Sequence, residues 1–145
     1  MILDFNKLCD LRKHVTMVDG GFDPIHLGHI EYFKEAEKLG LPVLCCMACD
    51  QYICTKHKPL LPEDYRAGII SAIRYIEHVH INQRTTAEVL AELQPAFYAK
   101  GKDWEGRLPK SELEACDKYG IKVVYLNTIL DSSSLILRRY NKGAQ

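Results

Sequence analysis

Two histidines stand three residues apart at the end of the segment Gly20-Gly21-Phe22-Asp23-Pro24-Ile25-His26-Leu27-Gly28-His29. An apolar run precedes this segment and an amphipathic run follows it, which predicts a strand, a glycine-containing turn and the start of a helix. The spacing places His26 and His29 on one face of the helix N-terminus, where free N–H groups and the helix dipole favour anions. Imidazole N–H donors would add to such a phosphate site, and paired glycines let the backbone approach a ligand closely.

The elements that must position these histidines follow from the apolar pattern along the whole chain. Strands are expected at residues 15–20, 43–48, 78–81, 96–99 and 121–126. Helices are expected at residues 27–39, 62–76, 86–94 and 109–119, and from Ser132 or Ser133 through Arg139, with Ile69, Ile70, Ile73 and Ile76 as the apolar stripe of the second. Strands that alternate with helices predict an α/β fold, a doubly wound, Rossmann-like parallel sheet of about five strands. We expect one domain over residues 1–145, with 1–14 as an N-terminal extension.

The other polar candidates also follow expected strands, and ligands of doubly wound sheets bind beyond the carboxyl ends of the strands. We therefore expect a single site along that edge. Lysines in a loop suit a triphosphate as point charges, and serine hydroxyls at a helix start bind phosphate oxygens. These candidates are Lys56 and Lys58, then Lys100, Gly101, Asp103 and Trp104, and finally Ser132, Ser133 and Ser134.

Arg66 lies in the first turn of the helix expected at residues 62–76. Its planar guanidinium suits a phosphate or a carboxylate. We predict that Arg66 binds the ligand or shapes the site, the alternative being a pair with Glu63 or Asp64 in the same turn.

These segments together resemble the H-x-G-H nucleotidylyltransferase superfamily, in order and over residues 15–139. The run Asp103-Trp104-Glu105-Gly106-Arg107 resembles glycerol-3-phosphate cytidylyltransferases, whereas Ala99-Lys100-Gly101 resembles heptose-phosphate adenylyltransferases. Ser132–Ser134 resembles the family's S-S/T-S/T-x-I signature. The cytidylyl branch usually carries an R-T-x-G segment before these serines, and residues 127–130 of this chain contain no arginine, which argues against CTP.

The resemblance implies transfer of CMP or AMP from CTP or ATP to a small phosphorylated acceptor, a polyol or sugar phosphate, with release of pyrophosphate. It implies that His26, His29 and Lys56 act on the transferring phosphates and that the other candidates bind the nucleotide. It also implies Mg²⁺, held mainly by the triphosphate, with Asp23 and Asp103 orienting ligands or a water of the ion. Two alternatives remain open, an adenylyltransferase for FMN or nicotinamide mononucleotide and a non-catalytic nucleotide-binding regulatory domain.

Composition sets the remaining expectations. The formal net charge of +0 gives no general attraction to nucleic acid or to anionic membranes. No apolar run approaches the roughly 20 residues of a membrane span, and the start of the chain lacks a signal-peptide core, so we expect a cytoplasmic protein. Relatives in the family are often dimers, and apolar residues 76–81 are the candidate surface for a homodimer. The six cysteines lack zinc-site spacing, so we expect buried thiols, with Cys54 near the lysines as a candidate reactive thiol.

Overall fold

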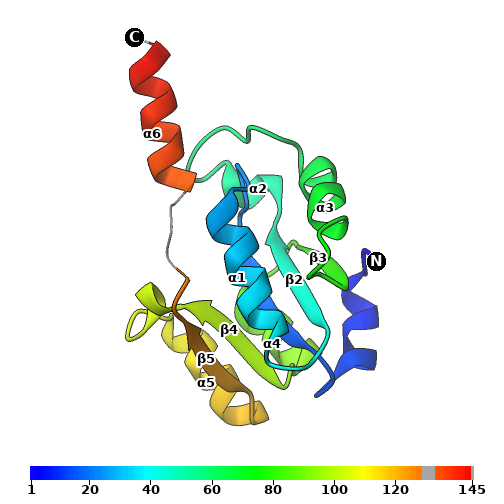
Figure 1. Cartoon of the computed structure of the whole chain (residues 1–145). Helices are drawn as coiled ribbons and strands as arrows, with labels where there is room; N and C mark the ends of the chain where they lie inside the picture. Colours follow the sequence, from blue (N-terminus) through cyan, green and yellow to red (C-terminus); the bar gives the residue numbers. More distant parts are fainter. Residues whose placement is uncertain (129–132, 145) are drawn as a thin grey trace.

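The computed structural model describes residues 1–128 and 133–144, and its centre is one parallel sheet (Figure 1). The strand order is β3-β2-β1-β4-β5, so the strands run outward in both directions from β1. This arrangement confirms the expected doubly wound, Rossmann-like α/β fold. The strands are β1 (Thr16–Gly20), β2 (Val43–Ala48), β3 (His78–Asn82), β4 (Phe97–Gly101) and β5 (Lys122–Leu126).

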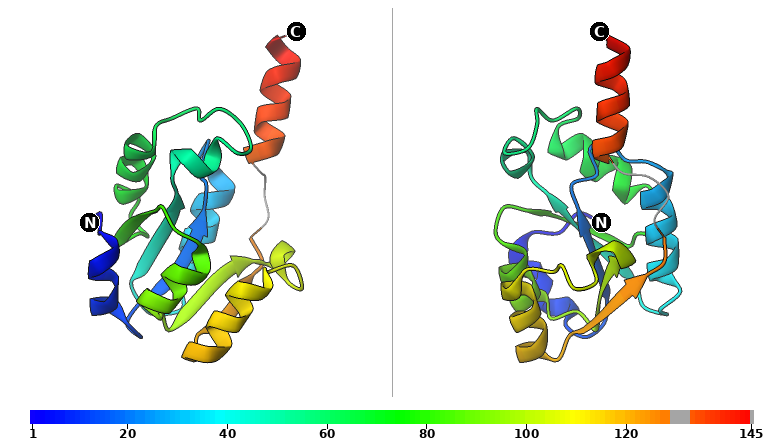
Figure 2. Two further views of the ribbon diagram at one scale, coloured as in Figure 1. Left: turned by 180° about the vertical axis from the view of Figure 1, so that it is seen from behind. Right: turned by 90° about the vertical axis from the view of Figure 1, so that its left-hand side faces the viewer.

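Helices cover both faces of the sheet (Figures 1 and 2). Apolar side chains of α1 (Leu27–Glu37) and α3 (Glu63–Ser71) pack on one face. Those of η1 (Phe5–Leu11), α4 (Thr86–Leu93) and α5 (Lys110–Tyr119) pack on the other. Two short elements follow strands, α2 (Asp50–Ile53) after β2 and η2 (Lys102–Trp104) after β4, while α6 (Ser133–Ala144) extends away from the sheet.

Local sequence explains where these elements begin and end. The first five residues of β2 are buried because helices cover both of its faces, which matches its unbroken apolar sequence. Thr85 and Glu88 form a reciprocal capping box at the start of α4. Gly120 ends α5 with a φ of 65°, a left-handed conformation that glycine adopts without a steric penalty.

One predicted helix is shorter than expected. The helix expected at residues 62–76 ends at Ser71, because the N–H groups of Ile73 and Ile76 bond to carbonyls three residues earlier and tighten the chain into turns. Ile76 is buried where the chain enters β3, whereas Ile69 is 42% exposed, so its predicted place in the apolar stripe is wrong. The α2 helix has four residues, too few for a periodic pattern to reveal it.

The first 14 residues pack against the domain and contribute Leu8 to its core. Leu8 is fully buried beneath α4, and Ile2 forms a parallel bridge with Val79 of β3. Because Ile76 and Val79 are buried within the chain itself, residues 76–81 do not offer the apolar dimer surface that the sequence indicated.

All six cysteines are free thiols. The expected burial is confirmed for Cys45, Cys46, Cys49 and Cys116, whereas Cys9 is half-buried and Cys54 is exposed. Burial raises the pKa of the Cys45 and Cys46 thiols. Within the described ranges, no helix has the length and apolar content needed to cross a membrane.

Candidate active site

The turn between β1 and α1 is tightly packed against α2. A Cβ atom on Gly21 would lie 2.7 Å from the Cδ1 atom of Ile53, so a larger residue here would require the Ile53 side chain to move. Phe22 has a φ of 55°, and its buried ring lies edge-on to His29 with centroids 4.8 Å apart. Gly28 is buried in the first turn of α1. The packing of this turn therefore holds the two histidines in place at the start of α1.

His26 and His29 meet at the N-terminus of α1, as their spacing predicted. Their rings stack with centroids 3.7 Å apart. The backbone N–H of His26, the N-cap residue, donates to Nδ1 of His29 at 3.2 Å. Burial and the neighbouring His26 lower the pKa of His29 to about 3. His29 is therefore neutral near pH 7, and because Nδ1 accepts a hydrogen bond, Nε2 carries the proton and is a donor.

Asp23 ties this turn to the loop that follows α2. Its carboxylate, 2% exposed, accepts hydrogen bonds from the backbone N–H groups of Leu60 at 2.8 Å and Leu61 at 3.2 Å. The Nδ1 atom of His57 lies 3.9 Å from the same carboxylate. Both oxygens therefore brace the loop of residues 55–61, and the ligand-orienting role of Asp23 stays a prediction.

Arg66 is the largest fully buried side chain and joins three segments beneath the turn. Nε donates to the Leu61 carbonyl at 3.0 Å, and Nη1 donates to the carbonyls of Gly21 at 2.7 Å and Ala48 at 2.8 Å. Nη2 lies 2.6 Å from the Asp50 carboxylate, which balances the charge. Of the predicted roles, the contacts fit shaping of the site, and the acidic partner is Asp50 in place of Glu63 or Asp64.

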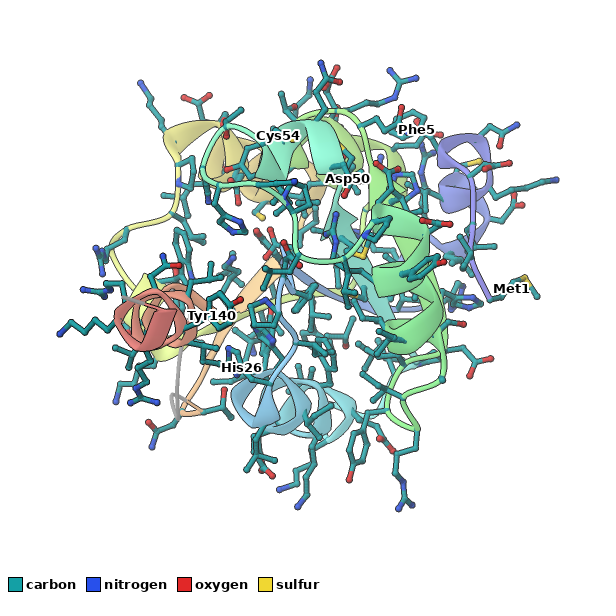
Figure 3. The ribbon with its side chains drawn as sticks, turned by 90° about the horizontal axis from the view of Figure 1, so that it is seen from above. Met1, Phe5, His26, Asp50, Cys54 and Tyr140 are labelled. Atoms are coloured by element: carbon teal, nitrogen blue, oxygen red, sulfur yellow. The ribbon has the colours of Figure 1, made fainter. Side chains whose placement is uncertain are left out.

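Lys56 and Lys58 lie in the loop that Asp23 and Arg66 hold. Both side chains are exposed, and Nζ of Lys56 lies 5.0 Å from the centroid of the Tyr52 ring. Figure 3 shows α2, with Asp50 and Cys54 labelled, across the carboxyl edge of the sheet from His26. The loop thus carries two exposed cations and is tied by Asp23 to the turn that bears the histidines.

The end of β4 brings Lys100 to Asp19 at the end of β1. Nζ of Lys100, 6% exposed as a residue, lies 2.6 Å from Oδ1 of Asp19 and 4.3 Å from the centroid of the Trp104 ring. Asp103 is exposed, with Oδ1 2.6 Å from where a Cβ on Gly101 would stand. Trp104 is 42% exposed, so its ring covers Lys100 and also faces solvent.

A proton-sharing chain continues from Asp19 into the protein. The Tyr98 hydroxyl lies 2.9 Å from Asp19 Oδ2 and 2.7 Å from Glu112 Oε1. A phenol has one hydrogen and can donate to only one carboxylate at a time. The hydroxyl is therefore shared between the two carboxylates, and burial raises the pKa of Glu112.

The three predicted serines lie at the start of the last helix or just before it. Ser132 lies outside the described residues, while Ser133 and Ser134 form the first positions of α6. Over residues 1–128 and 133–144, no cluster of three or more His, Cys, Asp or Glu side chains is arranged to hold a metal ion.

Comparison with known proteins places this geometry in a family. A profile of the cytidylyltransferase-like family matches residues 17–139, which contain the histidine pair, the lysine loop and the end of β4. The chain belongs to the cytidylyltransferase-like family. It is therefore a nucleotidyltransferase, as the motifs indicated.

Individual relatives resemble this nucleotidyltransferase over much of its length. The bifunctional protein HldE of Aliarcobacter butzleri is 29% identical over 105 residues, 70% of this chain and 22% of that protein. The FAD synthase of Archaeoglobus fulgidus is 33% identical over 88 residues, 60% of this chain and 64% of that protein. A lipopolysaccharide core biosynthesis protein from Thermoplasma volcanium superposes with a TM-score of 0.68 at 28% identity, and the match covers 80% of this chain and 98% of that chain.

Three residues of this nucleotidyltransferase site escaped the sequence analysis. Asp19, Asp50 and Tyr98 lie next to predicted residues and hold them through charge or hydrogen bonds. Asp19 had a usable signal, a carboxylate at the end of an apolar strand directly before the glycines. Asp50 and Tyr98 had none, because their partners are 16 and 79 residues away along the chain.

Proposed function

We propose that this nucleotidyltransferase transfers AMP from ATP to a small phosphorylated acceptor, a sugar or polyol phosphate, and releases pyrophosphate. The observation that supports it best is the histidine pair at the N-terminus of α1. Neutral His29 presents Nε2–H where the helix dipole and free N–H groups also favour an anion. Such a set of fixed donors suits the charge that develops on phosphate oxygens during transfer.

In the proposed reaction, an oxygen of the acceptor phosphate attacks the α-phosphorus of ATP in line with the leaving group. A new phosphoanhydride bond forms, the bond between the α- and β-phosphates breaks, and pyrophosphate leaves with the bonding electrons. The chain needs no nucleophile of its own for this step, so positioning and charge stabilisation carry the catalysis. His26 and His29 would contact the transferring phosphate, and the exposed ammonium groups of Lys56 and Lys58 would neutralise the pyrophosphate.

Mg²⁺ would arrive with the triphosphate as part of the substrate, since this ion keeps phosphate oxygens and waters as most of its ligands. The Asp23 carboxylate accepts two backbone N–H groups and so is a poor candidate to hold the ion directly. Asp103, exposed at the end of β4, is the better placed of the two predicted carboxylates.

The choice of ATP and of a sugar phosphate rests on the relatives and on one sequence departure. FAD contains an adenylate, so a relative named FAD synthase favours ATP as the donor. The missing arginine before the serines argues against CTP in the same direction. The Thermoplasma protein, matched over 98% of its length, is named for lipopolysaccharide core synthesis, which favours a sugar-derived acceptor. The FAD synthase match also supports a second candidate acceptor, FMN.

A pyrophosphate-release screen tests the proposal. ATP, CTP, GTP and UTP are each combined with glycerol 3-phosphate, several sugar 1-phosphates, FMN and nicotinamide mononucleotide, with Mg²⁺ present. Turnover with ATP and a sugar or polyol phosphate is expected, turnover with FMN would establish the second candidate, and turnover with CTP would overturn the donor. ATP binding without turnover in any combination would favour the regulatory domain.

The histidine assignment has its own test in the same assay. His29→Ala should lower kcat/KM by about 100-fold, the usual cost of losing an oxyanion donor. His78→Ala is the matched control, because His78 is also a histidine of lowered pKa but lies on β3. A loss of less than about threefold in His29→Ala would defeat the assignment.

A further inference from the structure

A hollow of about 510 Å³ lies at the end of β3, between the first five residues and the chain that leads into α4. We call it the β3-edge pocket, and Asp4, Phe5, His80 and Arg84 line it together with aliphatic side chains. Figure 3 shows Met1 and Phe5 on the opposite side of the molecule from Tyr140 and well away from His26. The pocket is therefore separate from the nucleotidyl-transfer site.

His80 gives this pocket an unsatisfied hydrogen-bond acceptor. The residue is 5% exposed, and its Nδ1 lies 2.9 Å from the carbonyl oxygen of Leu3. Because a carbonyl only accepts, Nδ1 must carry the proton, which leaves a lone pair on Nε2. Nε2 is buried and has no hydrogen-bond partner in the described part of the chain. Burial also lowers the pKa of His80, so the ring stays neutral.

The pocket also carries two opposite charges, those of Arg84 and Asp4, which do not pair with each other in the described part of the chain. The Arg84 guanidinium stacks on the Phe5 ring, its Cζ atom 4.1 Å from the ring centroid, which fixes the plane of the guanidinium. Stacking uses the face of the group and leaves its N–H edge for an anion. Across residues 1–128 and 133–144, neither Arg84 nor Asp4 takes part in an ion pair.

The rest of the wall is aliphatic. Ile2, Leu3 and Ile81 line the hollow beside the polar groups. Ile2 is 50% exposed, although it is held in place by its bridge to Val79. A ligand that covered Ile2 would remove apolar surface from water, which favours binding.

We propose that the β3-edge pocket binds a small zwitterion, an α-amino acid with an aliphatic side chain. Its carboxylate pairs with Arg84, its ammonium group pairs with Asp4 beside the neutral His80 ring, and its side chain covers Ile2, Leu3 and Ile81. A ligand with only an anionic group would form no pair with Asp4, and a simple amine would form no pair with Arg84. The combination of a cation, an anion and an aliphatic wall in one hollow selects the zwitterion.

The first test titrates L-leucine into the ¹⁵N-labelled full chain without nucleotide and follows its NMR spectrum. Saturable shifts with a millimolar Kd are expected for the amides of residues 2–5 and 80–84 and for Nε2 of His80. 4-Methylpentanoate and 3-methylbutylamine, which each retain one of the two charges, should bind at least about tenfold more weakly. No saturable shift with L-leucine, or equal binding of all three compounds, would overturn the proposal.

Variants locate the site. Arg84→Gln and Asp4→Asn should each weaken L-leucine binding about tenfold or more. Arg74→Gln is the matched control, because Arg74 also lies over an aromatic ring, that of Tyr75, but outside the pocket. Unchanged affinity in Arg84→Gln, or shifts confined to residues 20–29, would contradict the assignment. His29→Ala should bind L-leucine as the natural chain does, so this result is independent of the proposed transfer reaction.

Discussion

Acid should destabilise this protein through His29 specifically, and the structure gives the size of the effect. The pKa of His29 is lowered from 6.5 to about 3 by burial and by His26. The unfolded chain therefore binds an additional proton between these two values, and the free energy of unfolding falls as the pH falls through that window. At pH 5 the solution lies about 1.5 pH units below the pKa of 6.5 that His29 has in the unfolded chain. This gap corresponds to a loss of about 2 kcal/mol in the free energy of unfolding.

The assay is urea unfolding at pH 7.5 and pH 5.0 for the natural chain and for His29→Asn. Asparagine keeps an acceptor for the backbone N–H of His26 but has no group that titrates in this range. The natural chain should lose about 2 kcal/mol more than the variant between the two pH values. Other histidines of lowered pKa, His78 and His80, are common to both proteins and cancel in this difference.

Equal losses in the two proteins would refute the reasoning, since they would mean that folding does not depress the pKa of His29. NMR titration of the His29 ring provides a second measure in the folded state. A midpoint near 6.5 would remove the neutral Nε2–H donor from the proposed mechanism at slightly acid pH.

Three further substitutions test other contacts of the site. Arg66→Met should lower the free energy of unfolding by about 3–5 kcal/mol, because it leaves Asp50 unpaired and three carbonyls without their donor. The control Arg74→Met, at an exposed arginine, should change the free energy of unfolding by less than about 0.5 kcal/mol. Tyr98→Phe should cost about 1–3 kcal/mol in urea unfolding because Glu112 and Asp19 lose their shared hydroxyl, and a neutral result would argue against that proton-sharing chain. Lys56→Ala should raise the KM for ATP more than the KM for the acceptor, and equal changes in both steady-state constants would argue against the triphosphate role of the loop.

Much of the fold could be predicted from the sequence because its strands are buried on both faces. Runs such as Val43–Ala48 are apolar throughout and so stand out from the amphipathic helices around them. The predictions are wrong where the spacing of apolar residues does not match the secondary structure that the chain forms. The chain beyond Ser71 keeps helical spacing of isoleucines but forms turns, and the first 14 residues read as an extension although Leu8 is fully buried.

The site could be predicted in part, for a related reason. His26 and His29 meet through local spacing in one helix, which a sequence displays directly. Lys100 and Asp19 meet through the pairing of strands that are 81 residues apart, and nothing local in the sequence indicates that contact. Contacts of that kind depend on strand order and register, which the sequence pattern does not specify.

Arg66 and Asp23 show how residues of a motif also hold the site together. The described contacts of both join separate segments of the protein, and the ligand-binding roles assigned from residue type and position stay predictions. Asp23 reaches from the histidine turn to the backbone of Leu60 and Leu61. Arg66, on α3, donates to the carbonyls of both Leu61 and Gly21, so it joins the same two segments from a third element. They therefore hold the loop of Lys56 next to the histidine pair, and these are the two groups that the proposed reaction brings to one triphosphate.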